Sequence, residues 1–125
     1  MLALGCAESS SSFREVSLED ARRLIAAGDV TIVDALAEDS EPAPALAGGL
    51  RWKVAPTAPN LPPGLPDGAV LIIGSSPGLG YGSAAALART GRRPVYVFIT
   101  RSRRERNALV AVALRSREAS DGRDS

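Results

Sequence analysis

The chain of 125 residues contains no histidine, and Cys6 is its only cysteine. Without histidine there is no imidazole for acid–base catalysis, and neither a Ser-His nor a Cys-His nucleophile pair can form. A single cysteine excludes an intramolecular disulfide, and the two shortages together exclude an ordinary zinc site. We therefore expect neither a bound metal nor a cofactor.

Aromatic residues make up only 4% of the chain, and the formal net charge is +1. No apolar run approaches the roughly twenty residues that a membrane-spanning helix needs, so we expect no transmembrane segment. Four arginines gather before and within the last predicted helix, but without the interleaved aromatics that stack on bases, so we expect no nucleic-acid partner. We interpret this cluster as a solvated face, with a docking patch for an acidic partner as the alternative; its members are Arg101, Arg103, Arg104 and Arg106.

The first twelve residues combine a short apolar run, Cys6 and a serine tract, and we expect residues 1–12 to form a disordered tail. The alternative is that Leu2 to Cys6 resembles the end of a bacterial lipoprotein signal, with Cys6 lipidated and the serines acting as a tether. That alternative needs a start codon upstream of Met1. It places the domain at the periplasmic side or the cell surface, whereas the first interpretation places it in the cytoplasm.

Local signals mark the elements of the first half. Ser17 can accept a hydrogen bond from a free amide at a helix start, and Gly28 supplies a helix stop. Residues 30–33 are suited to a buried strand. The connection that follows is rich in proline, with a short extended piece at 50–54 in which Trp52 is expected to be a packing anchor.

The second half begins with the strongest strand signal of the chain, residues 69–73. A glycine-rich loop follows, and Gly82 or Ser83 is expected to open an alanine-rich helix that ends at Gly91. Residues 94–99 predict a further strand.

Ser102 and Glu105 have the spacing of a capping box, in which each side chain satisfies a free backbone amide of the other residue. They precede a last helix, and we expect residues 118–125 to form a second disordered tail. The alternation of helices and strands predicts a three-layer α/β/α fold with a small, mostly parallel sheet. The chain length fits a single domain, which we assign to residues 13–117.

Three segments resemble the rhodanese-like family. Residues 15–34 are similar to its opening helix and the strand that ends in an aspartate, here Asp34. Residues 65–73 resemble the strand that leads to its active-site loop, and residues 83–97 resemble the helix and strand after that loop. The resemblance implies a rhodanese-like fold.

The departures from this family fall on its functional positions. Members place a cysteine directly after the central strand, in a loop whose inward amides hold a persulfide or an oxyanion. Here residues 74–82 contain no cysteine, and neither Ser75 nor Ser76 can carry sulfur, because a serine hydroxyl is scarcely ionised near neutral pH. The resemblance thus implies a pseudoenzyme without sulfurtransferase activity.

Such a domain is expected to act as a binding or regulatory module for a protein partner or a small anion. Asp34 is a candidate for a residue that supports the glycine-rich loop without contacting the ligand itself. The candidate ligand-binding residues are those of the loop: Gly74, Ser75, Ser76, Gly78, Leu79, Gly80, Tyr81, Gly82 and Ser83.

The same glycine-rich loop also fits the Gly-x-x-x-Gly-x-Gly pattern of short-chain dehydrogenases, in which glycines let the backbone approach a pyrophosphate. The Tyr-x-x-x-Lys pair of those enzymes is absent, since Lys53 is the only lysine and Gly49 stands four positions before it. A truncated, Rossmann-like nucleotide-binding domain therefore remains as the alternative. The glycines can also serve only a tight turn between strand and helix.

Overall fold

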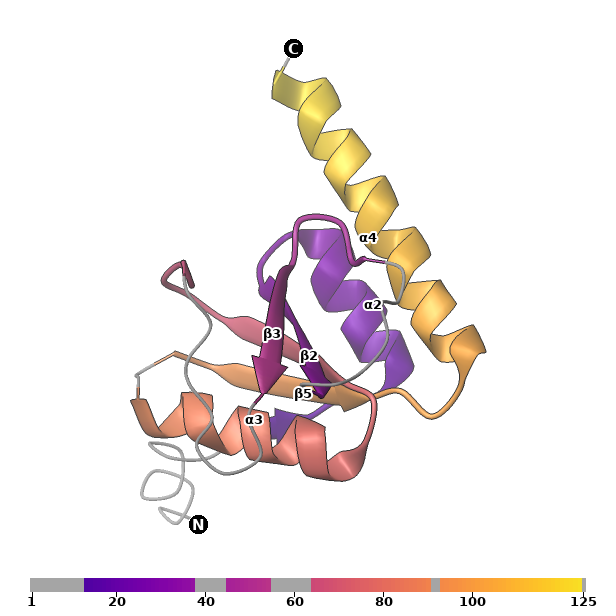
Figure 1. Cartoon of the computed structure of the whole chain (residues 1–125). Coiled ribbons are helices and arrows are strands. Elements are labelled where there is room, and N and C mark those ends of the chain that lie inside the picture. The colour runs from indigo at the N-terminus through magenta and orange to yellow at the C-terminus, as the bar shows by residue number, and fades with distance from the viewer. Residues whose placement is uncertain (1–12, 38–44, 55–63, 91–92, 125) are drawn as a thin grey trace, which may run out of the picture.

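The computed structural model describes residues 13–37, 45–54, 64–90 and 93–124 (Figure 1). Within them the chain forms an α/β fold with three helices and a small five-stranded sheet. The elements in chain order are β1 (Arg14–Glu15), α2 (Leu18–Ala27), β2 (Thr31–Ala37), β3 (Leu50–Val54), β4 (Val70–Gly74), α3 (Pro77–Thr90), β5 (Val95–Ile99) and α4 (Arg103–Asp124).

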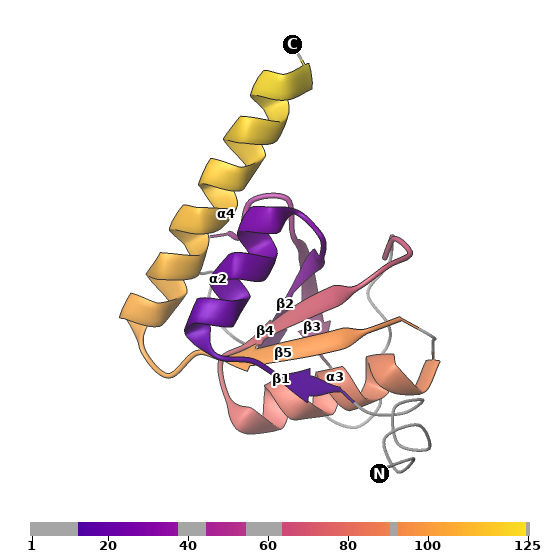
Figure 2. The ribbon, with the colours of Figure 1, turned by 180° about the vertical axis from the view of Figure 1, so that it is seen from behind.

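All paired strands are parallel, and their order across the sheet is β1-β5-β4-β2-β3. Every residue of the central strand β4 is buried. Its side chains alternate between two apolar clusters, with Val70 and Ile72 in one, and Leu71 and Ile73 in the other. Figures 1 and 2 show α3 on one face of the sheet and α2 with α4 on the opposite face. The predicted α/β class is confirmed, and helices on both faces are compatible with three layers.

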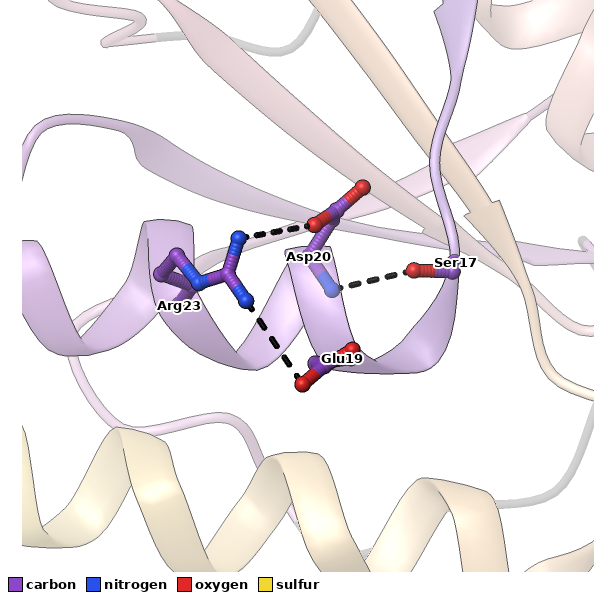
Figure 3. A network of polar contacts seen from close by, with 4 residues as sticks. All are labelled: Ser17, Glu19, Asp20 and Arg23. Atoms are coloured by element: carbon purple, nitrogen blue, oxygen red, sulfur yellow. Dashed lines mark hydrogen bonds and ion pairs between the residues drawn. The ribbon is translucent and has the colours of Figure 1, made fainter.

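Helix α2 begins and ends where the sequence predicts. The Asp20 amide donates to the Ser17 hydroxyl at 3.1 Å, and Gly28 ends the helix with a φ of 74° in the left-handed region. The Arg23 guanidinium lies 3.6 Å from a Glu19 carboxylate oxygen and 3.2 Å from an Asp20 carboxylate oxygen. Figure 3 shows the three side chains together. These side chains are well exposed, so the contacts contribute little to stability.

Strand β3 coincides with the extended piece predicted at residues 50–54 and pairs with β2. Trp52 is only 3% exposed and packs in the cluster on the α3 side, which confirms its predicted role as an anchor. Its indole N–H has no hydrogen-bond acceptor among the described residues. Strand β1, two residues that pair with β5, carries no signal that the sequence analysis detected.

The prediction that α3 opens at Gly82 or Ser83 is wrong, because the helix begins at Pro77. Ser76 caps it: its hydroxyl accepts from the Leu79 amide at 3.3 Å, and its carbonyl accepts from the Gly80 amide at 2.9 Å. Proline suits the first helical position, where its missing N–H removes no helical hydrogen bond. In place of the loop expected up to Gly82 or Ser83, a two-residue turn, Ser75–Ser76, leads directly into the helix.

Two glycines allow α3 to lie close to the sheet. A Cβ atom at Gly74 would stand 2.7 Å from the Gly80 Cα, and a Cβ atom at Gly80 would overlap the Ile99 side chain and reach within 3.3 Å of the Val97 Cγ2. At Gly82, in contrast, a Cβ would meet no atom within 4 Å among the described residues outside its own stretch of helix. Gly74 and Gly80 are therefore required by helix–strand packing.

Helix α4 places Leu109, Val112 and Ala113 in the core, whereas Leu114 is half exposed. It continues past Arg117, where the sequence analysis placed the start of a tail, to Asp124. In Figures 1 and 2 its last turns extend beyond the sheet. Among the described residues, no helix is long and apolar enough to cross a membrane.

The contrast between the glycines of α3 gives a matched pair of variants. We expect Gly80→Ala to lower the free energy of unfolding by about 1–3 kcal/mol, because the added methyl group overpacks the contact with β5. Gly82→Ala, two residues away in open space, should raise it by up to about 1 kcal/mol through helix propensity. Urea denaturation followed by circular dichroism measures both, and equal stabilities of the two variants would contradict the packing argument.

Candidate functional site

A hollow in the described part of the structure lies at the carboxyl ends of β4 and β5. Because these neighbouring parallel strands lead into helices on opposite faces, their two turns diverge and leave a space between them, the usual place for a ligand in such sheets. The hollow has a volume of about 790 Å³. We call it the crevice; its lining residues are Ser75, Ser76, Pro77, Ile99, Thr100, Arg101, Ser102, Arg103, Arg106 and Asn107.

The two turns that form the crevice are hydrogen-bonded to each other. The Gly74 carbonyl accepts from the Thr100 amide at 2.8 Å and from the Thr100 hydroxyl at 3.2 Å. The end of β4 and the end of β5 are thereby held together at the base of the crevice.

The N-terminal ends of α3 and α4 both lie at the crevice, and each is capped by a serine. The Ser102 hydroxyl accepts from the Glu105 amide at 3.2 Å, as the capping box predicts. The reciprocal bond differs, because the Glu105 carboxylate accepts from the Arg101 amide at 2.6 Å rather than from the Ser102 amide. The positive ends of two helix dipoles therefore meet at one site, which favours negative charge.

Arg106 is not part of a solvated face, and this prediction is wrong. Its two terminal nitrogens donate to the two carboxylate oxygens of Asp34, each at 2.7 Å. Asp34 is 1% exposed and the Arg106 side chain 14%, so the pair lies in a low-dielectric setting. Donation to the Asp34 carboxylate raises the pKa of the Arg106 guanidinium above its usual value.

The pair gives Asp34 a role that local sequence patterns do not suggest. It connects the middle of β2 to the first turn of α4, across 72 positions of sequence. Asp34 does not line the crevice, but it holds Arg106, which does. It also cancels the charge of that arginine.

Arg101 and Arg103 differ from Arg106, because both are exposed and neither has an ion-pair partner among the described residues. Both line the crevice, whereas Arg104 does not. The positive charge available to a ligand there thus comes from two arginines and two helix ends, and the Glu105 carboxylate in the first turn of α4 offsets part of it.

Of the residues predicted to bind a ligand, only Ser75 and Ser76 line the crevice. Gly74 ends β4, and the others lie in the first two turns of α3: Gly78, Leu79, Gly80, Tyr81, Gly82 and Ser83. The buried Ser83 hydroxyl donates to the Leu79 carbonyl at 2.6 Å, within the helix. These residues do not form the loop that the sequence analysis expected.

The Tyr81 side chain contacts residues near β1 and does not line the crevice. Its ring stacks on Phe13, with centroids 5.8 Å apart and planes inclined by 18°. A hydrogen bond to the Glu15 carboxylate raises the pKa of the Tyr81 phenol. Tyr81 therefore ties α3 to the segment around β1.

Residues 99–103 and Asn107 contribute most of the crevice. The sequence suggested Arg101 and Arg103 only as part of a docking patch, and their place beside the turn after β4 was not predicted. The available signal was their place directly after a predicted strand, since the carboxyl ends of parallel strands share one edge of a sheet. The lining contains no carboxylate, lysine or cysteine. Among the described residues no group of three potential metal ligands occurs, and the lipidation candidate Cys6 lies outside those residues.

Comparisons with protein-family models, with curated proteins and with solved structures found no match for this chain.

The buried ion pair can be tested by removing its negative charge. We expect Asp34→Asn to lower the free energy of unfolding by about 3 kcal/mol, because Arg106 then keeps a charge in a mostly buried position without its partner. The same substitution in the exposed pair, Asp20→Asn, should cost at most about 1 kcal/mol. Thermal and urea denaturation measure both variants. Similar losses in the two would contradict the assignment of Asp34 as a structural anchor.

Proposed function

We propose that this chain is a non-catalytic, rhodanese-like binding module that holds a small anion in the crevice. The observation that carries the proposal is the meeting of Arg101 and Arg103 with the starts of α3 and α4 in one hollow. Positive charge from side chains and from helix ends acts there on the same space, and both favour an oxyanion.

The absence of a base in the lining supports binding rather than catalysis. Ser75 stands directly after β4, where the rhodanese-like family places its cysteine. A serine needs a neighbouring base to become a nucleophile, and the lining residues include neither a carboxylate nor a lysine, while the chain has no histidine. A bound anion would therefore be held rather than attacked.

The rhodanese-like part of the proposal rests on the order of elements. Helix α2, strand β2, the central strand β4, helix α3 and strand β5 occur in the order that the resembling segments imply. The site itself differs from the expected one, because a two-residue turn and a capped helix stand in place of the family's loop. The anion site is accordingly assigned to both turns of the crevice rather than to residues 74–83.

Titration with sulfate and phosphate at low ionic strength tests the proposed site. We expect Arg101→Ala and Arg103→Ala each to weaken binding about tenfold, because each removes a charge-assisted hydrogen bond. Arg89→Ala, which removes an exposed arginine at the other end of α3, should leave the affinity unchanged. Isothermal titration calorimetry and amide chemical shifts follow the binding.

If Arg89→Ala weakens anion binding as much as Arg101→Ala and Arg103→Ala do, the binding reflects general charge attraction and not a site in the crevice. Titration with NAD, NADP and ATP in the same buffer tests the alternative of a Rossmann-like nucleotide-binding domain. Micromolar binding of one of these that is lost in Gly78→Asp would favour that alternative.

A sulfurtransferase assay tests the non-catalytic part of the proposal. With thiosulfate and cyanide, we expect thiocyanate to form no faster than without protein, since Ser75 cannot carry sulfur. The Cys6→Ala variant is the control for chance reactivity of the only thiol in the chain. Thiocyanate formation that persists in this variant would refute the proposal.

A further inference from the structure

We propose that the ligand of the crevice is a sugar phosphate, that is, a phosphate monoester on a polyhydroxylated body. This inference rests on the proposed function, because it uses the same site and the same two arginines. It adds the chemical class of the ligand beyond its negative charge.

The size of the crevice favours a ligand larger than an inorganic ion. Its volume of about 790 Å³ lies in the range of about 300–1,000 Å³ that is typical of sites for small organic molecules. A phosphate held by Arg101 and Arg103 would fill only part of this space. The remainder offers room for an attached body.

The polar groups of the lining suit a body that carries hydroxyl groups. The hydroxyls of Ser76 and Ser102 each accept a hydrogen bond from a backbone amide, so their own protons stay available for donation to a ligand. Asn107 is exposed at the crevice and offers both a donor and an acceptor, and Ser75 adds another hydroxyl. Sugar hydroxyls both donate and accept, which matches this set.

The same lining disfavours a nucleotide. It contains no aromatic side chain on which a base could stack, and stacking is a main source of affinity for bases. It also lacks the carboxylate that accepts from a ribose hydroxyl in dinucleotide sites. Pro77, which is exposed at the crevice, can contact the C–H groups of a sugar ring without requiring a planar partner.

Four probes separate the parts of such a ligand: inorganic phosphate, ribose, ribose 5-phosphate and adenosine 5′-monophosphate. We expect ribose 5-phosphate to bind at least tenfold more tightly than phosphate, and ribose alone to give no detectable heat. The adenosine monophosphate should bind no more tightly than ribose 5-phosphate. Isothermal titration calorimetry on the full chain measures all four.

Two variants assign the contributions to the head group and the body. Arg101→Ala should weaken phosphate and ribose 5-phosphate alike, whereas Asn107→Ala should weaken ribose 5-phosphate several-fold and leave phosphate unchanged. Asn107 is exposed on a helix, so this variant is expected to fold. Chemical shift changes should map both ligands to the crevice.

The outcomes distinguish this inference from the proposed function. Equal affinities for phosphate and ribose 5-phosphate would overturn the proposal that the ligand is a sugar phosphate, but would leave the proposed anion site standing. Markedly tighter binding of adenosine 5′-monophosphate than of ribose 5-phosphate would indicate that the crevice binds nucleotides instead. No binding of either phosphate or ribose 5-phosphate would overturn both proposals.

Discussion

Asp34 on β2 and Arg106 on α4 meet through two short hydrogen bonds at the carboxyl edge of the sheet, nearly out of contact with water. Each residue would be costly to bury alone, so the position of one requires the other. The pair sets where the first turns of α4 lie relative to β2, and thereby places Ser102, Arg101 and Arg103 beside the turn that leaves β4. The crevice depends on this placement.

The opposite wall of the crevice, formed by the start of α3, depends on the close packing of this helix against the sheet. Gly74 and Gly80 let the start of α3 approach β4 and β5 so closely that side chains at these positions would collide with backbone or with Ile99. A glycine-rich segment that resembles a phosphate-binding loop in sequence thus has a packing explanation for two of its glycines. The anion-binding potential arises from the helix starts and from the arginines across the crevice.

Local physical signals predicted most of the scaffold. Ser17 and Gly28 cap the two ends of α2 as capping rules require, and the apolar runs around residues 70 and 95 form β4 and β5. The start of α3 was missed because the glycines after Pro77 argued for a loop, although Ser76 followed by Pro77 is itself a helix-start signal. Packing against the sheet overrode the weak helix propensity of glycine.

The site was less predictable than the scaffold, because it depends on which strands are neighbours. Ser75 and Ser76 were identified from their place after the central strand, but Arg101 and Arg103 joined them only through the pairing of β4 with β5. The contact between Asp34 and Arg106 spans most of the chain and follows no periodic pattern. Long-range pairings of this kind become visible only in the folded structure.

The double hydrogen bond from Thr100 to the Gly74 carbonyl has a consequence for recognition. It joins the two turns at their bases, so the walls of the crevice cannot separate independently when a molecule enters. A guest would meet a shape that already exists and would spend little binding energy on ordering the backbone. Discrimination between guests would then depend on how the side chains at the rim fit them, with little contribution from closure of the protein around the guest.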